Sequence, residues 1–468
     1  MKFTLMLTDA SVTVEATGLH LFGGQMAVRR SAVPGVDVVL DSLEQTYPEL
    51  GRKPFPRQFC NLPRLLETMA ARDLDGIVSY YSPNVCYLSG YATGSSAMVH
   101  EANGYSAVIL SRHQPDHPIV VIPEFEINYF ARQPSWINDV RPYASLMLPL
   151  DVEATAAALD RYIAPGTREL AWVPSARAHY SLDLADACVR AVRDLGLERA
   201  RVGFDNLMFA PVLTAALPDM QVADAYGALK FTRQAKTPAE TEILREAVQL
   251  NQTALERTVA AWAPGMSWHE LNIAYYTNAI RLGGFIHDRG SLILANDLGQ
   301  EPTLLLSSGL EEDFELPRGI NVMFDCHGTW RRYTWDGGKT WIIDDEPTGD
   351  QRTVADAAAA TMEDLMDALR PGVGVMELVR RGRQTLRKTG LPEAEDALIF
   401  FHGCGLENSE RETAGRIDWK LEEGMVISLH VLVPGGDRRR WYLEEVASVA
   451  PTGADRFYSW GTKPLVNR

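Results

Sequence analysis

Several features are scarce in this chain, and each absence argues against a class of protein. No apolar run is long enough to cross a bilayer, which argues against a membrane-spanning protein. Only five cysteines occur in 468 residues, and their odd number and scattered positions fit reduced thiols better than a disulfide framework. The opening segment MKFTLMLTD has only a short apolar patch before Asp9, so we expect no secretory signal and a cytoplasmic location.

Positive charge is also in short supply. Lysine and arginine number 45 against 61 aspartates and glutamates, which gives a formal net charge of -16. This balance argues against nucleic acid or an anionic membrane surface as a partner, so we expect a small-molecule substrate. The composition is otherwise ordinary for a globular protein, and the length is sufficient for two domains with sizeable cores.

Three parts are expected along the chain. Residues 1–57 are hard to interpret and contain several prolines, which indicates a loop-rich arm. Residues 58–225 alternate apolar strand patterns with amphipathic helix patterns, which predicts an α/β domain. A further domain is expected over residues 226–468. Its long predicted helix has a clear start, where Thr237 and Glu240 form a capping box.

An internal repeat organises this last domain. The segment PGMSWHEL at Pro264–Leu271 recurs as PGVGVMEL at Pro371–Leu378. Each copy follows one helix pattern, opens another and precedes strand patterns. The repeat predicts two similar halves packed about a pseudo-two-fold axis, with a site where their sheets meet. The alternative is two unrelated helix breaks at Pro-Gly.

The stretch from Asn321 to Ile343 has acidic residues on both arms of a predicted β-hairpin. With the turn at Thr329 to Arg332, Asp325 and Asp336 face each other, and opposed Cβ atoms lie about 4.5–5.5 Å apart. Two like charges held so close need a cation or a shared proton between them.

A second predicted hairpin lies near the C-terminus and carries a histidine and a glutamate. The strand GMVISLHVLV, the turn PGGD and the return strand WYLEEVASV place His430 opposite Glu444. Between the two hairpins, His402 follows two phenylalanines and precedes a glycine. A lone strand histidine is most often a packed core residue, but the five residues together make a mixed oxygen and nitrogen set. Such a set suits Mn, Fe, Co or Zn.

In this order and spacing, the motifs resemble the creatinase/aminopeptidase P/prolidase superfamily. They are an aspartate pair eleven residues apart, then HGCGL, then EGMV, then a glutamate in a late strand. The resemblance covers about 227–455, and residues 58–225 resemble the creatinase-like N-terminal domain of the two-domain members. It implies an α+β pita-bread fold for the C-terminal domain, a dinuclear metal site and a homodimer.

The resemblance also shows departures. Position by position, the family's metal ligands fall here on Asp325, Asp336, His402 and Glu444. The remaining family ligand is a glutamate, and His430 stands in its place. Since a histidine cannot bridge two ions as a carboxylate does, we expect one tight ion and at most a weaker second one. Ser409 replaces a second histidine of the peptidases, and Ser291–Gly309 contains no histidine where they carry another.

The resemblance implies a metal-dependent hydrolase that cleaves an amide or related C–N bond in a small polar substrate. The metal would act as a Lewis acid and lower the pKa of water. His402 and His430 are the expected catalytic histidines. Among the carboxylates of ENSERE, Glu410 is a candidate general base, although such a stretch is commonly a solvated loop.

Two other functions remain open. Dimethylsulfoniopropionate lyases share the family's fold and also lack the second histidine after HGxGL. Trp330, Tyr333 and Trp335 crowd the first predicted hairpin, and their faces would attract an onium substrate, unless the rings only pack on the sheet. The third possibility is an inactive metal-binding scaffold, which the missing histidines favour and the retained acidic set disfavours.

Overall fold

The computed structural model describes residues 56–94, 105–133, 135–145, 155–286, 313–411, 418–436 and 438–466, and the strands at 2–7, 10–15 and 291–295. The chain divides into two compact units, one comprising Met1–Lys53 with Arg281–Gly283 and the other the remainder. In the first unit, strands β1 (Lys2–Leu7) and β2 (Ala10–Glu15) pair antiparallel. The sheets and helices that follow belong to the second unit, except for Arg281, the last residue of α11 (Trp268–Arg281).

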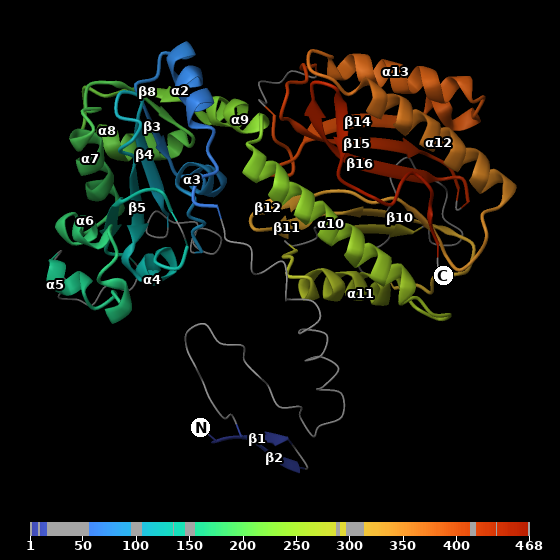
Figure 1. Cartoon of the computed structure of the whole chain (residues 1–468), viewed down its shortest axis with the longest axis horizontal. Helices are drawn as coiled ribbons and strands as arrows, with labels where there is room; N and C mark the ends of the chain where they lie inside the picture. The colour runs from blue at the N-terminus through green and yellow to red at the C-terminus, as the bar shows by residue number, and fades with distance from the viewer. Residues whose placement is uncertain are drawn as a thin grey trace. The chain divides into compact units, whose positions relative to one another are not determined.

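The N-terminal part of this unit is a six-stranded sheet with the order β6-β5-β4-β3-β7-β8 and helices around it (Figure 1). Its strands are β3 (Gly76–Ser79), β4 (Ala107–Ser111), β5 (Ile119–Pro123), β6 (Asp139–Tyr143), β7 (Arg201–Phe204) and β8 (Gln221–Asp224). The helices are α2 (Leu62–Ala71), α3 (Ser82–Ser89), α4 (Ile127–Phe130), α5 (Ala156–Leu159), α6 (Val173–Ala178), α7 (Leu184–Asp194), α8 (Ala210–Thr214) and α9 (Tyr226–Gln234). Strand β4 runs antiparallel to both neighbours, and the other pairs are parallel. The predicted α/β class is confirmed.

The C-terminal part consists of two helix-pair and sheet units. The first contains α10 (Pro238–Ala260), α11 (Trp268–Arg281), β9 (Ser291–Ala295), β10 (Asn321–Cys326), β11 (Gly328–Trp330), β12 (Tyr333–Trp335) and β13 (Thr340–Ile342). The second contains α12 (Gly349–Ala368), α13 (Val375–Lys388), β14 (Leu398–Gly403), β15 (Val426–Val433), β16 (Trp441–Ala450) and β17 (Gly453–Arg456). Strand β18 (Leu465–Val466) returns to the first half of this C-terminal part, where it pairs with β13. The two similar halves predicted from the repeat are present, and their arrangement is the pita-bread fold that the family resemblance implied.

The predicted repeat is visible in the backbone. Gly265 and Gly372 occupy equivalent turns between the paired helices, and both have φ of 88°, a left-handed conformation that favours glycine. The next helix of each half starts with an equivalent bond, since the N–H groups of Trp268 and Val375 each donate at 2.9 Å to a carbonyl in a later segment. The capping box of Thr237 at the start of α10 is also confirmed.

One face of the β14–β16 sheet is covered by α12 and α13, and an apolar core lies between them (Figure 1). Ile399 and Phe401 of β14 point into this core. Because side chains alternate along a strand, Phe400 and His402 point to the opposite face. The sheet therefore presents these residues away from its helices, and this is where the candidate site lies.

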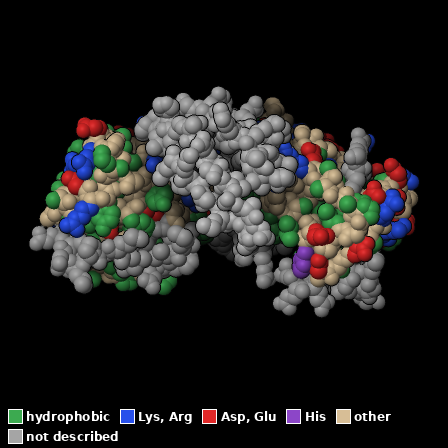
Figure 2. Space-filling view, turned by 90° about the horizontal axis from the view of Figure 1, so that it is seen from below, with side chains coloured by type: hydrophobic (Ala, Val, Ile, Leu, Met, Phe, Trp, Pro, Cys, Tyr) green, Lys and Arg blue, Asp and Glu red, His purple; other side chains and the backbone are tan. Residues whose placement is uncertain are grey.

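The described surface is mixed in character. On the face drawn in Figure 2, acidic and basic side chains are interspersed with apolar ones over the described residues. Within the part of the chain that the structure describes, no helix combines the length and apolar composition needed to cross a bilayer.

Candidate metal centre

Strands of the second half place polar side chains on one face of their sheet. β14 pairs antiparallel with β15, and β15 pairs antiparallel with β16. This register sets His430 opposite Glu444, so the predicted pairing of the two residues is confirmed. His430 Nε2 lies 3.0 Å from Glu444 Oε1, and both side chains are almost fully buried. An imidazole and a carboxylate thus meet where water is largely excluded.

The two aspartates do not form the single hairpin expected from the sequence. Strand β10 pairs with β9 and β13, so Asp325 stands opposite Leu292. A separate short hairpin, β11–β12, turns at Arg331 and Arg332, whose φ angles are 50° and 73°. Asp336 follows directly after β12. The predicted cross-strand pairing of Asp325 with Asp336 is therefore wrong, although their side chains do come together.

Two glycines explain how the chain brings Asp336 back beside β10. Gly337 has φ of 130°, which side chains with a Cβ rarely adopt. At Gly338, a Cβ would overlap the carbonyl group of Phe324 in β10. Only glycine permits this close backbone approach, and it lets the β10–β13 pairing continue, since the N–H groups of Phe324 and Cys326 donate to the carbonyls of Lys339 and Gly337.

His327 belongs to the site, and the sequence prediction missed it. Its Nδ1 lies 3.3 Å from Oδ1 of Asp336 and 3.6 Å from Oδ1 of Asp325. His327 stands two residues after Asp325, and alternation along an extended chain puts such residues on the same side. The motif Asp325-Cys326-His327 is therefore the signal in the sequence that could have identified it.

Two groups of three side chains meet here, and Asp336 belongs to both. The inner group is Asp336, His402 and His430, and the outer group is Asp325, His327 and Asp336. Within each group, potential ligand atoms lie within 4.8 Å of one another. Oδ2 of Asp336 is 3.0 Å from Nε2 of His402, yet Asp336 Oδ2 and His327 Nδ1 are buried without an aligned hydrogen bond. Buried polar atoms in this state are costly, which favours a cation as their partner.

Burial and crowding shift the protonation of these groups. Burial raises the pKa of Asp325 to about 7, and Glu444 and Asp336 add to this effect. Burial acts in the same direction on Asp336, but the two neighbouring histidines hold its pKa well below the usual range. Burial, followed by the charge of a nearby histidine, lowers the pKa of His430 to about 4. Three buried acids beside a neutral imidazole favour a bound cation.

The spacing of these atoms fits a divalent transition metal. Two atoms bound to one tetrahedral ion at about 2.0–2.1 Å stand about 3.3 Å apart. The nitrogen–oxygen separations here range from 3.0 to 3.6 Å. The carbonyl of Phe400 lies 3.3 Å from Nδ1 of His430, which assigns the ring proton to Nδ1 and leaves Nε2 as a free lone pair. Such imidazole and carboxylate atoms suit Mn, Fe, Co or Zn.

Glu410 lies in a buried ion-pair network and belongs to neither group of ligand atoms. Its carboxylate pairs with Arg233 and, at 2.7 Å, with Lys236. Burial acts to raise the pKa of Glu410, but these two cations lower it to about 2. A carboxylate so strongly held as an anion is a poor proton acceptor near neutral pH. The general-base role considered for Glu410 therefore does not fit its position.

The aromatic side chains expected at the substrate are buried as well. Tyr333 and Trp335 are 0% exposed and Trp330 is 8% exposed. The polar atom of each ring donates a 3.1 Å hydrogen bond to a residue of α10 or α11. These rings pack the β11–β12 hairpin onto the helices, so a substrate-contacting role does not fit their positions.

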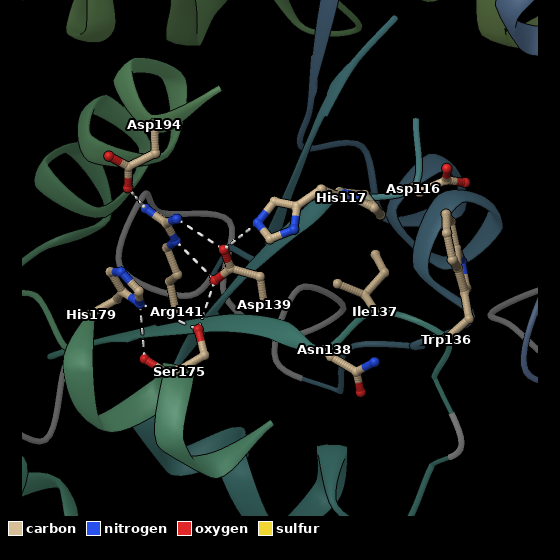
Figure 3. Close-up of a pocket in the computed structure, with 11 residues that line it drawn as sticks. Asp116, His117, Trp136, Ile137, Asn138, Asp139, Arg141, Ser175, His179 and Asp194 are labelled. Carbon is tan, nitrogen blue, oxygen red and sulfur yellow. Dashed lines mark hydrogen bonds and ion pairs between the residues drawn. The ribbon is translucent and has the colours of Figure 1, made fainter. Parts of the chain in front are cut away.

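A separate cavity of about 570 Å³ lies in the N-terminal part, lined by residues of β6, α6 and α7 (Figure 3). At its base, Arg141 donates to both oxygens of Asp139, at 3.0 and 2.9 Å, and also pairs with Asp194. Ser175 and His117 complete the partners of Asp139. The charges of this base satisfy one another, so the network ties β6 to α6 and α7 without needing a ligand.

Comparisons with known proteins agree with this fold. The family model described as Metallopeptidase family M24 matches residues 242–449, and that of the Creatinase/Prolidase N-terminal domain matches residues 62–234. The Xaa-Pro dipeptidase from Bacillus anthracis has 17% identity and a TM-score of 0.63, over 86% of this chain and 98% of that chain. The X-Pro aminopeptidase from Thermotoga maritima has 16% identity and a TM-score of 0.63, over 87% of this chain and 99% of that chain. The prolidase from Pyrococcus horikoshii has 16% identity and a TM-score of 0.61, over 86% and 98%. No curated protein matches the sequence significantly.

The two-domain fold and the paired ligand groups define a metallopeptidase-like hydrolase. With both family models matched in the expected order, the chain belongs to the creatinase/aminopeptidase P/prolidase superfamily. At this low sequence identity, the similarity to the solved structures supports the fold alone. The substrate has to be inferred from this chain's own residues.

Proposed function

We propose that this protein is a metal-dependent hydrolase that cleaves an amide or related C–N bond in a small polar substrate. The main support is the inner group, whose ligand atoms from both halves lie within 4.8 Å of one another. Glu444 lies 3.0 Å from His430, and Asp325 shares the outer group with Asp336, which supports a role for both as ligands. A divalent ion held there would supply Lewis-acid activation of the substrate and of water near neutral pH.

The burial of these residues indicates how a substrate reaches them. The side chains of Asp336, His430 and Glu444 are at most 3% exposed, so their role is to hold and orient. His402 is 18% exposed and His327 is 26% exposed, which places them on the open side. A substrate therefore approaches past these two imidazoles, which are positioned to donate or accept a proton when they do not bind metal.

The proposal excludes Xaa-Pro dipeptides as the main substrates. A peptidase must also hold the scissile carbonyl and protonate the leaving amine, and proton transfer by a positioned group contributes roughly 10²–10⁴-fold in rate. The hydroxyl of Ser409 cannot serve as an acid with a pKa near seven. The backbone carbonyl of Ser409 accepts a 2.8 Å hydrogen bond from Lys230. We expect turnover of Xaa-Pro dipeptides far below the roughly 10 s⁻¹ ordinary for enzymes.

The experiment compares metal-loaded protein on Xaa-Pro dipeptides, small polar amides, and betaine-type or sulfonium compounds. Asp336→Asn, prepared in the same way, controls for contaminating peptidase. Ordinary turnover of dipeptides would return the assignment to peptidase. Cleavage of the sulfonium compounds alone would support a lyase, and metal uptake without turnover of any compound would support a scaffold.

Phe400 offers an exposed aromatic surface at the edge of the candidate site. Its ring stacks on His430, with centroids 4.0 Å apart and 13° between the planes, and the residue is 40% exposed. One face of the ring is therefore covered, and the other is available to an apolar or cationic part of the substrate. The buried rings of the β11–β12 hairpin have no such free surface, so the aromatic contact proposed for the substrate moves to Phe400.

We expect Phe400→Ala to raise KM by about tenfold with little change in kcat, since a contact of this kind contributes roughly 0.5–2 kcal/mol. Phe400→Tyr keeps the aromatic face and should stay near wild type. The kinetics are measured on the best compound of the panel, with metal content checked in each variant. A fall in kcat at unchanged KM would argue that Phe400 only supports His430.

We also infer a cytoplasmic homodimer. The location is supported by five buried free thiols, which suit a reducing compartment. The dimer is supported by the family resemblance, and light scattering of the purified protein tests it against the 51.9 kDa chain mass.

A further inference from the structure

His327 has no counterpart in the ligand set expected from the sequence. It nevertheless stands between two acids, with Nδ1 at 3.3 Å from Asp336 and 3.6 Å from Asp325. That nitrogen is buried and has no aligned hydrogen bond. The nitrogen lies near two carboxylate oxygens, but it is not aligned to donate a hydrogen bond to either. This is the geometry of atoms that bind the same metal ion rather than of a hydrogen-bond donor and its acceptors.

Asp336 is the residue that joins the two groups. Its Oδ1 faces His327 at 3.3 Å, and its Oδ2 faces His402 at 3.0 Å. Each oxygen is thus directed toward a different histidine. A carboxylate can bridge two ions in this way, whereas the imidazole of His430 cannot. Any bridging by a carboxylate within the two groups therefore falls to Asp336.

We propose that His327 is a metal ligand and that it holds a second ion together with Asp325 and Asp336. The inference rests on the proposed function, because it concerns the same centre. The first ion belongs to the inner group, which is the more buried of the two. The second ion lies in the outer group, where Asp325 and His327 are 17% and 26% exposed, and it is the weaker of the two.

The nitrogen content of the centre also defines the class of ion. Each group combines imidazole with carboxylate, so neither is the all-oxygen environment that Mg²⁺ favours. Borderline ions such as Zn²⁺ and Co²⁺ suit both groups better. Co²⁺ is the useful probe, because its absorption and magnetic resonance spectra report the ligands and the coupling of two ions.

The test is a Co²⁺ titration of metal-free, full-length protein, followed by calorimetry and by spectroscopy. Wild type should take up two ions in two steps, with magnetic coupling between them. His327→Ala should lose the second step and the coupling, and should keep the first step within about threefold. His327→Asp returns an oxygen ligand, so it should regain a second ion and shift its preference toward Mn²⁺. His113→Ala, an exposed histidine of the N-terminal part, should match wild type.

The outcomes separate this inference from the proposed function. No uptake by wild type would overturn both. If wild type binds two ions and His327→Ala gives the same titration, only the role of His327 is overturned. The same conclusion follows if wild type and His327→Ala each bind a single ion. If His327 were merely a positive partner of the two aspartates, its removal would tighten the second step, because a competing charge would be gone. Failure of His327→Ala to fold leaves His327→Asp as the deciding variant.

Discussion

Asp336→Asn should abolish tight binding of divalent metal. Asp336 is 2% exposed and belongs to both ligand groups, so its change affects the whole centre. Asparagine keeps the shape but loses the charge and one oxygen ligand. Since even supporting residues around a metal contribute 10–100-fold to affinity, we expect a loss of more than about 100-fold. Elemental analysis and calorimetric titration of the purified variant measure this loss.

A thermal readout complements the metal analysis. At a metal concentration of about 100 times Kd, binding stabilises a folded protein by about 2.7 kcal/mol. Wild type should therefore melt at a higher temperature with metal than with chelator, and Asp336→Asn should melt equally in both. Asp345→Asn, at an exposed aspartate, is the matched control and should behave as wild type. Equal metal content in wild type and Asp336→Asn would show that these carboxylates do not hold the ion.

The two predicted hairpins show what strand periodicity can and cannot determine. His430 and Glu444 lie in long, uninterrupted strands joined by a turn, so counting outward from the turn gave the correct register. Asp325 and Asp336 are separated by a short extra hairpin and by Gly337 and Gly338. The inserted β11–β12 hairpin moves the partner of β10 to the segment after Asp336, and counting outward from a single turn does not reveal that insertion.

The environment of a side chain was the harder part to predict. The residue types at Glu410 and Trp335 suggested a base and a substrate contact, but partners distant in sequence bury both. Glu410 meets cations more than 170 residues earlier in the chain. His327 was missed for the opposite reason, because local alternation with Asp325 already indicated it. The repeat, in contrast, depends on local turns at Gly265 and Gly372, and it was predicted correctly.

The network around Arg233 should make a large contribution to the stability of the protein. Arg233 is 0% exposed and pairs with Glu407 and Glu410, while Lys236 pairs with Glu410 at 2.7 Å. The same loop accepts a 2.7 Å hydrogen bond from the N–H of Thr334 at Gly405. The network therefore anchors the segment after His402 to the strand that leads to Asp336.

We expect Arg233→Met to lower the free energy of unfolding by roughly 3–5 kcal/mol at pH 7, because it leaves two glutamates without their central cation. Arg257→Met removes an exposed arginine and should stay within about 0.5 kcal/mol of wild type. The double variant Arg233→Met with Glu410→Gln should be no more stable than Arg233→Met, because Glu410 still pairs with the buried Lys236 in the single variant. Urea unfolding measures all three variants.

The pH dependence gives a second, independent check. Burial acts to raise the pKa of Glu410, but Arg233 and Lys236 lower it from 4.5 to about 2 in the folded protein. An acid whose pKa is lower in the folded protein than in the unfolded chain adds stability above its unfolded pKa. This stability is lost as the pH falls through the folded-state pKa. Wild type should thus lose this contribution between about pH 4.5 and pH 2, and Arg233→Met should lose less over that window. A loss at pH 7 no larger than that of Arg257→Met, or an unchanged acid profile, would show that the network contributes little to stability.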